Sequence, residues 1–275
     1  MPKAKRIILL GATGSIGSNT LEIIQQFPDD FQLVGISAHK NSQALAQIAE
    51  TYNVPSIAIS DESTYQSAIE EQLFSNHSKI YGGEQALHQL IEVTQADMVV
   101  VAIVGAQALS PTLKAIQKGR DIALANKELL VLGGPFVTKA IQENQVRLLP
   151  IDSEHNAIFQ CLQGNNSKDL KSIILTASGG ACRDIPIDQL DKITPEQAKQ
   201  HPNWSMGAKI TIDSATMANK GLEIIEARWL FDLKPEQIKV TIHPESIVHS
   251  FVQWIDGSVI AQLSPPSMTF AIQHC

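Results

Sequence analysis

The 275-residue sequence has few cysteines, fewer basic than acidic side chains and no long apolar run. Cys161, Cys182 and Cys275 are odd in number and far apart, so they indicate no disulfide framework and favour a reducing compartment. The longest apolar run, Met98–Ala106, is too short to cross a bilayer. A formal net charge of −7 argues against nucleic acid or an anionic membrane as a partner. We therefore expect a cytoplasmic protein that binds neither nucleic acid nor membrane.

The length and composition indicate two globular domains. An apolar fraction of 44% and a charged fraction of 18% are typical of a globular chain with a sizeable core, and 275 residues exceed one ordinary domain. The pattern of elements changes near Pro150. We therefore expect domains at residues 1–149 and 150–275.

A glycine-rich turn follows the first predicted strand. Residues 6–10 form the short apolar run of a buried parallel strand, and Gly11, Gly14 and Gly17 lead directly into a helical pattern. Strand, glycine loop and helix in this order are the context of a dinucleotide-binding fingerprint, because glycine lets the backbone approach a pyrophosphate. The spacing is G-x-x-G-x-x-G rather than G-x-G-x-x-G, so an ordinary glycine-rich turn is the alternative.

The second predicted strand, Phe31–Ser37, bears on the choice of cofactor. An NAD-specific protein usually has an acidic residue near the end of this strand to bind the ribose 2′-hydroxyl. The chain has no acid there and instead carries Lys40. This favours NADP(H), although Lys40 could equally be a solvated loop residue.

Strand and helix patterns alternate through the first domain. Further strands are predicted at 56–59, 98–104 and 121–124, and helices at 43–51, 62–74, 84–92 and 109–117. This alternation predicts an α/β fold, a doubly wound Rossmann-like parallel sheet with ligands at the carboxyl ends of its strands. Asn126, Lys127 and Glu128 follow one such end, although Asn126 and Glu128 could equally cap a helix.

The second domain is predicted to be α+β, and two carboxylates stand at its first strand-to-helix junction. Asp152 and Glu154 could turn the same way and bind a hard divalent cation. The alternative is helix capping by Asp152 or Ser153, with Glu154 favouring the first turn. Asp213–Ser214 are predicted to cap a long helix that carries Glu223.

Two further features of the second domain have a structural and a functional interpretation. On the predicted long helix, Asn219, Lys220 and Glu223 share one face and could belong to a site. The alternative is that Lys220 and Glu223 form an ordinary surface ion pair. The loop around Trp204 is typical of a lid, or of a tryptophan that anchors a loop.

Several runs together resemble one enzyme family. They are GATGSIG, LANKE, IDSEHNAIFQ, the Ser-Gly-Gly turn at Ser178, HPNWSMG, KITIDSATMANKGLEIIEA, HPESIVHS and DGSVIAQL. They cover nearly the whole chain and are similar to 1-deoxy-D-xylulose 5-phosphate reductoisomerase. The resemblance implies rearrangement of 1-deoxy-D-xylulose 5-phosphate and reduction of the resulting aldehyde by NADPH. The product is 2-C-methyl-D-erythritol 4-phosphate, in non-mevalonate isoprenoid biosynthesis.

The resemblance also implies site residues. Expected ligands for magnesium, manganese or cobalt are Asp152, Glu154 and Glu223. Expected catalytic residues are these three with Lys127 and His201. Expected NADPH contacts are Thr13, Gly14, Ser15, Ile16, Lys40, Asn41, Asn126, Glu128 and Gly207. Expected contacts to the phosphorylated sugar are Lys127, Ser153, Glu154, Ser178, His201, Trp204, Ser214, Asn219, Lys220 and Glu223, with Trp204 and Met206 on a mobile flap. A homodimer is the family expectation.

The sequence departs from the family pattern in two places. His39 stands where relatives usually have glycine, which would alter the fit around the adenosine phosphate. The family continues into a C-terminal helical domain, whereas this chain stops at Cys275, and Ser264–Thr269 differ from the usual pattern. We therefore expect a C-terminally shortened product without that domain.

Two other functions fit parts of the sequence. An NADP-dependent semialdehyde dehydrogenase would use Cys182 as its nucleophile, which requires a nearby base. An inactive NADP(H)-binding fragment, serving as a redox-sensing module, would keep the first domain and lose catalysis.

Overall fold

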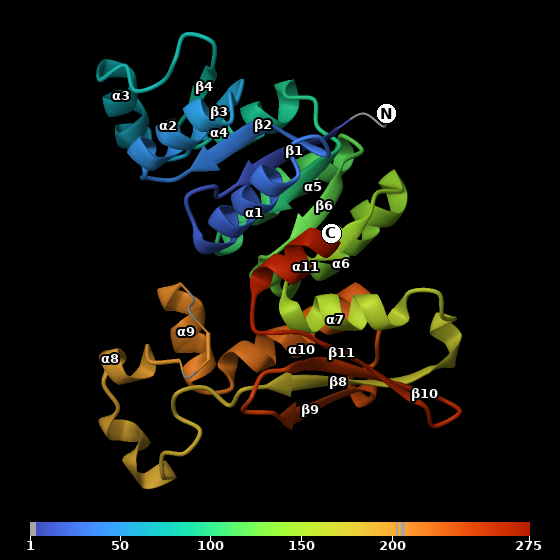
Figure 1. Cartoon of the computed structure of the whole chain (residues 1–275). Coiled ribbons are helices and arrows are strands. Elements are labelled where there is room, and N and C mark those ends of the chain that lie inside the picture. The colour runs from blue at the N-terminus through green and yellow to red at the C-terminus, as the bar shows by residue number, and fades with distance from the viewer. Residues whose placement is uncertain (1–3, 202, 205–206) are drawn as a thin grey trace. The chain divides into compact units, whose positions relative to one another are not determined.

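The computed structural model describes residues 4–201, 203–204 and 207–275, and it divides into two compact units. Met1–Leu149 with Cys275 form the first unit, and Pro150–His274 form the second (Figure 1). Within the described ranges, none of the helices combines the length and the apolarity that a bilayer crossing requires.

The first unit is an open α/β sheet with helices between its strands (Figure 1). Its strands are β1 (Lys5–Leu10), β2 (Phe31–Ala38), β3 (Ser56–Ile59), β4 (Lys79–Gly82), β5 (Met98–Val101), β6 (Asp121–Leu124) and β7 (Leu148–Pro150). Its helices are α1 (Ser15–Gln26), α2 (Ser42–Thr51), α3 (Glu62–Glu70), α4 (Ala86–Val93), η1 (Ala106–Ala108), α5 (Leu109–Gln117) and α6 (Lys127–Asn144).

The strand order of this sheet reverses at β1. The order is β4-β3-β2-β1-β5-β6-β7, and β1 pairs in parallel with both β2 and β5. The chain therefore moves outward on one side of β1 and then crosses to its other side. In doubly wound sheets, ligands bind at the carboxyl ends of the strands where the order reverses in this way. This end of the sheet carries the glycine turn after β1, so the predicted fold of the first unit is confirmed.

The second unit is built on a four-stranded sheet. The strands β8 (Leu170–Ala177), β9 (Ile238–Ile242), β10 (Val248–Trp254) and β11 (Val259–Leu263) have the order β11-β10-β8-β9. The helices are α7 (Ser153–Leu162), η2 (Ser167–Asp169), η3 (Ile187–Lys192), α8 (Pro195–Ala198), α9 (Ala208–Ala215), α10 (Ala218–Phe231), η4 (Pro235–Gln237) and α11 (Met268–His274).

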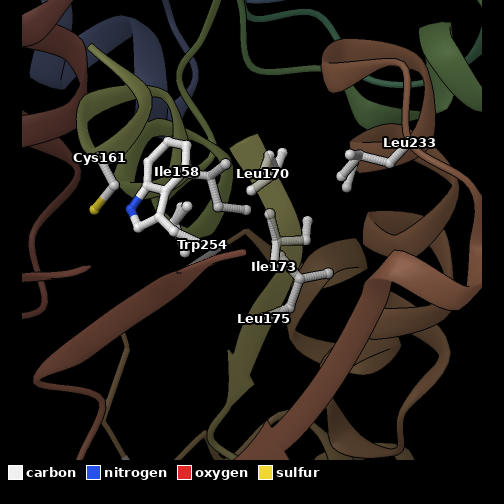
Figure 2. Packing of buried hydrophobic residues seen from close by; sticks show 9 residues of the cluster. Ile158, Cys161, Leu170, Ile173, Leu175, Leu233 and Trp254 are labelled. Carbon is white, nitrogen blue, oxygen red and sulfur yellow. The ribbon is translucent and has the colours of Figure 1, made fainter. Parts of the chain in front are cut away.

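A buried apolar cluster joins α7 and α10 to this sheet. Val252 of β10 stands opposite Ile173 of β8, and Trp254 lies two residues further on the same face. Ile158 of α7 and Ala227 of α10 pack against these side chains. Figure 2 shows Ile158, Ile173 and Trp254 of this cluster. The two helices that carry the candidate metal ligands are therefore fixed to the same apolar layer.

Some boundaries differ from the sequence prediction. The predicted N-cap at Asp213–Ser214 is wrong: both residues lie within α9, and the next helix begins only at Ala218 after a break at Thr216. The strand predicted at 98–104 ends at Val101, because the chain turns toward Gly105, whose φ is +81°. The apolar run continues from Met98 through Val104, so composition alone does not mark the end of this strand.

Replacement of Ile173 by alanine tests the apolar layer of the second unit. Ile173 is fully buried, so we expect Ile173→Ala to lower the free energy of unfolding by about 2–5 kcal/mol. All three tryptophans lie in the second unit, so urea unfolding followed by tryptophan fluorescence reports on this unit. Lys171→Ala, at an exposed position of the same strand, should change the value by less than about 0.5 kcal/mol. Equal effects of the two substitutions would contradict the assigned packing.

Candidate active site

The turn after β1 depends on glycine for close backbone packing. Gly11 has a φ of +90°, and a Cβ atom there would lie 2.7 Å from the carbonyl oxygen of Ala102, beyond the end of β5. A Cβ atom on Gly17 would lie 2.4 Å from the carbonyl oxygen of Gly11. These contacts bring the start of α1 tightly against the turn, as a dinucleotide-binding loop requires.

The start of α1 offers main-chain donors to an anion. Thr13 and Gly14 lie in the turn, and Ser15 and Ile16 are the first residues of the helix. Gly14 is the N-cap and no side chain caps the helix. The first N–H groups of a helix have no partner within the helix, so they and the helix dipole favour a phosphate group.

The end of β2 carries the residues predicted to select the cofactor. His39 and Lys40 are exposed, and Nδ1 of His39 lies 3.0 Å from Oγ of Ser60, which follows β3. Asn41 accepts a hydrogen bond from the main-chain N–H of Ala44 and so caps α2.

Asn126 uses its side chain to hold two segments together. Its Oδ1 accepts from the N–H of Leu129 and caps α6, while its Nδ2 donates to the carbonyl oxygens of Ile103 and Gly105. Asn126 therefore caps α6 and shapes the loop after β5, and its contact to NADPH stays a prediction. Lys127, the first residue of α6, is buried, and Glu128 beside it is partly exposed.

The second unit brings together three carboxylates from distant parts of the chain. One oxygen each of Asp152, Glu154 and Glu223 lies within 4.8 Å of the others. Asp152 stands at the N-cap of α7, yet its side chain makes no capping hydrogen bond. Its carboxylate lies near the other two and does not cap the helix. Three converging hard oxygen ligands fit a cation such as Mg²⁺ or Mn²⁺.

Lys220 and Asn219 contact these carboxylates directly. The Lys220 ammonium donates to Glu154 Oε1 at 3.0 Å and forms an ion pair with Glu223, and the Asn219 amide donates to Glu223 at 2.5 Å. Burial disfavours the charge on Lys220, but the attraction of Glu154 and Glu223 outweighs it and raises the pKa of Lys220 above its ordinary value. Ser153 donates to Glu154 at 2.7 Å.

Two residues beside the cluster have no role assigned from the sequence. His155 and Glu226 are fully buried, and with Asp152 they form a second group of potential ligands within 4.8 Å of one another. Burial disfavours the charged imidazole, but Glu226, then Asp152 and Glu223, outweigh it and raise the pKa of His155. The signal was available: Glu226 follows Glu223 by three residues, and His155 follows Asp152 by three, so each lies one helical turn away.

Ser178 and His201, both predicted substrate contacts, meet at a hydrogen bond of 3.0 Å. Nδ1 of His201 accepts from the N–H groups of Asn203 and Trp204, so the proton lies on Nε2, which donates to Ser178. Burial lowers the pKa of His201, in keeping with this neutral form. Ser214 lies nearby, because a Cβ atom on Gly180 would meet its carbonyl oxygen at 1.7 Å.

The loop with Trp204 is anchored to the segment before β10. Asn203 donates to the carbonyl oxygen of Pro244 and lies 3.3 Å from Oγ of Ser246. The Trp204 ring meets the His249 ring edge to face, with centroids 6.1 Å apart. Met206, predicted as part of the flap, lies outside the described residues, and Gly207 is the N-cap of α9.

The fold and the site together define a class. A doubly wound sheet with a glycine turn and an uncapped helix start, joined in one chain to a carboxylate cation site, has the features of a metal-assisted, nicotinamide-dependent oxidoreductase.

Comparison with known proteins identifies the family. Residues 7–134 match the family described as 1-deoxy-D-xylulose 5-phosphate reductoisomerase, and residues 148–231 match its C-terminal domain. Relatives of that name from Clostridium novyi (strain NT) and Geobacillus sp. (strain WCH70) are 50% identical over 272 residues and 52% over 270 residues. Each alignment covers 98% of this chain and 70% of the relative. The chain belongs to the 1-deoxy-D-xylulose 5-phosphate reductoisomerase family.

Solved structures agree with this assignment. A reductoisomerase in complex with NADPH, fosmidomycin and magnesium superposes with a TM-score of 0.91 at 43% identity, covering 98% of this chain and 69% of that chain. The enzyme from Zymomonas mobilis in complex with NADPH gives a TM-score of 0.90 at 42% identity, covering 99% and 70%.

Replacement of Glu223 by glutamine tests the carboxylate cluster. Because a neutral amide is a poor ligand for a hard cation, we expect Glu223→Gln to weaken Mn²⁺ binding at least about tenfold. Isothermal titration with Mn²⁺ measures the change. Glu236→Gln, at an exposed position of η4, is the matched control and should bind as the unaltered chain does. Undiminished binding by Glu223→Gln would contradict the ligand assignment.

Proposed function

We propose that this chain catalyses the NADPH- and divalent-metal-dependent conversion of 1-deoxy-D-xylulose 5-phosphate to 2-C-methyl-D-erythritol 4-phosphate. The observation that carries the proposal is the convergence of Asp152, Glu154 and Glu223 in a chain of the reductoisomerase family. The carbon skeleton is first rearranged to an aldehyde. A hydride from NADPH and a proton then reduce that aldehyde to the alcohol.

The carboxylate cluster holds the reacting end of the substrate. A divalent cation bound by Asp152, Glu154 and Glu223 would supply Lewis acidity to the substrate's carbonyl and hydroxyl oxygens. Ser153 donates to Glu154 and is assigned to the same substrate oxygens by its place in the IDSEHNAIFQ run. Lys127 is assigned to the carbonyl end of the substrate by its place in the LANKE run.

The phosphate end of the substrate is assigned to neutral and cationic donors. Nε2–H of His201 and the hydroxyl of Ser178 form one hydrogen-bonded pair, with Ser214 adjoining through Gly180. Lys220 and Asn219 bind Glu154 and Glu223 in this structure. When those carboxylates bind a cation, the ammonium and the amide can turn to an anionic substrate. Trp204 belongs to the loop assigned as the flap.

The dinucleotide is assigned to the first unit. Main-chain N–H groups at the start of α1, over Thr13–Ile16, bind the pyrophosphate. Lys40 and Asn41, at the end of β2, bind the 2′-phosphate that distinguishes NADPH from NADH. Asn126 keeps the loop after β5 in place, and Glu128 and Gly207 complete the assigned contacts.

We also propose a cytoplasmic homodimer. Cys161, Cys182 and Cys275 are all free thiols, as a reducing compartment allows. In the second unit, the sheet face opposite the helices carries Phe251 and the exposed Val259. An apolar sheet face of this kind suits pairing with a second copy of the chain.

A coupled assay tests the proposed reaction and its rivals. We expect NADPH oxidation that depends on 1-deoxy-D-xylulose 5-phosphate, stops with a chelator and returns with Mg²⁺. Cofactor binding without turnover at saturating metal would instead support the inactive-fragment alternative.

Replacement of Cys182 separates the two enzyme classes. The structure gives the Cys182 main-chain N–H a bond to Ala215, and among the described residues no hydrogen bond joins its thiol to a histidine. We therefore expect Cys182→Ala to keep kcat within about threefold of the unaltered chain, because no step uses the thiol. Abolished turnover in a folded variant would support the thiohemiacetal mechanism.

A charge placed on the open sheet face tests the dimer. Val259→Asp should shift the chain from dimer to monomer in sedimentation velocity, because an unpaired carboxylate is costly in an apolar interface. Ile187→Asp replaces an equally apolar, exposed residue on η3, away from the sheet, and should leave the dimer intact. A monomeric unaltered chain would contradict the proposal.

A further inference from the structure

We propose that His155 and Glu226 are positioning residues, which hold the metal-binding carboxylates in register by fastening α7 to α10. The inference rests on the proposed metal site. Two of its ligands, Asp152 and Glu154, stand at the start of α7, whereas Glu223 lies on α10. The spacing between these helices therefore determines whether three oxygens can reach one ion.

His155 makes a direct hydrogen bond between the two helices. Its Nε2 atom lies 2.9 Å from the main-chain carbonyl oxygen of Glu223. A carbonyl oxygen only accepts hydrogen bonds, so Nε2 must carry the proton. The side chain is fully buried, where such a bond is not exchanged for one to water. One donor on α7 thus fixes the backbone of the ligand on α10.

The other ring nitrogen faces two carboxylates. Nδ1 lies 3.7 Å from Oδ2 of Asp152 and 3.6 Å from Oε2 of Glu226. Glu226 lies one turn after Glu223 on α10 and is fully buried. The imidazole therefore lies between Glu226 of α10 and Asp152 at the start of α7.

The imidazole ring lies nearly parallel to an aromatic neighbour. Phe231, at the end of α10, stacks against the imidazole with centroids 6.4 Å apart and planes within 8°. His155 therefore contacts the ligand set in three ways: as the sequence neighbour of Glu154, through the carbonyl group of Glu223, and across from Asp152. Groups that orient metal ligands in this way typically change metal affinity by about 10–100-fold when replaced.

Two substitutions at His155 separate the two ring nitrogens. Glutamine can place an amide N–H near the position of Nε2 and keep the bond to Glu223, whereas asparagine is too short to do so. We expect His155→Asn to weaken Mn²⁺ binding by about 10–100-fold and His155→Gln to stay within about threefold of the unaltered chain. Glu226→Gln, which keeps the shape but removes the charge beside Nδ1, should weaken binding by about fivefold or more. His77→Asn, at an exposed position of the first unit, is the control.

The readouts separate positioning from mere stability. Electron paramagnetic resonance of free Mn²⁺ measures affinity directly, and metal-free thermal unfolding measures folding. In turnover, His155→Asn should raise the half-saturating Mn²⁺ concentration while kcat at saturating Mn²⁺ stays within about threefold, because the ligands themselves are intact. Rescue by glutamine but not by asparagine is a pattern that a purely structural role would not produce.

The outcomes distinguish this inference from the proposed function. Absence of Mn²⁺ binding by the unaltered chain would overturn the metal site and the inference together. Normal binding that is lost in Glu223→Gln but unchanged in both His155→Asn and Glu226→Gln would overturn the positioning role alone. Where His155→Asn does not fold, Glu226→Gln decides: unchanged affinity in that variant overturns the proposal.

Discussion

Mutual repulsion among four converging carboxylates is the constraint on which the second unit depends. Asp152, Glu154, Glu223 and Glu226 lie where water screens their charges poorly, so the fold must supply compensation. Lys220 supplies one ammonium, in contact with Glu154 and Glu223. The imidazole of His155 lies between Asp152 and Glu226. A site so rich in oxygen ligands is completed by a divalent cation.

The rest of the second unit serves to keep these groups together despite their charge. Apolar contacts from α7 and α10 to the inner face of the sheet set the helix spacing, with Ile173 and Val252 at the centre of that layer. The residues assigned to the substrate phosphate are held by close backbone packing instead. At Gly180 the carbonyl group of Ser214 comes so near that no side chain would fit. Hydrophobic burial thus fixes the helices, and close main-chain packing fixes the turns.

Local signals predicted more of the first unit than of the second. The glycine turn was predictable because Gly11 and Gly17 are required by backbone contacts within a few residues. The alternating pattern predicted a parallel sheet, whereas the order of its strands comes from the structure. The meeting of Glu223 with Asp152 is different, since nothing in residue spacing encodes a contact across about 70 positions; only the family resemblance pointed to it. His155 follows Asp152 by three residues, but this spacing does not show that the imidazole contacts a second helix, which only the structure reveals.

Lys220 acts as an internal counter-ion, and this has a consequence for how the site exchanges its cation. The Lys220 ammonium forms ion pairs with Glu154 and Glu223, so without a metal it already neutralises part of the negative charge of the carboxylates. An incoming ion must displace that ammonium, so its affinity reflects a difference between two attractions rather than one attraction in full. The ammonium therefore lowers the affinity of the site below that of the three carboxylates alone, and it holds Glu154 and Glu223 together before a cation binds.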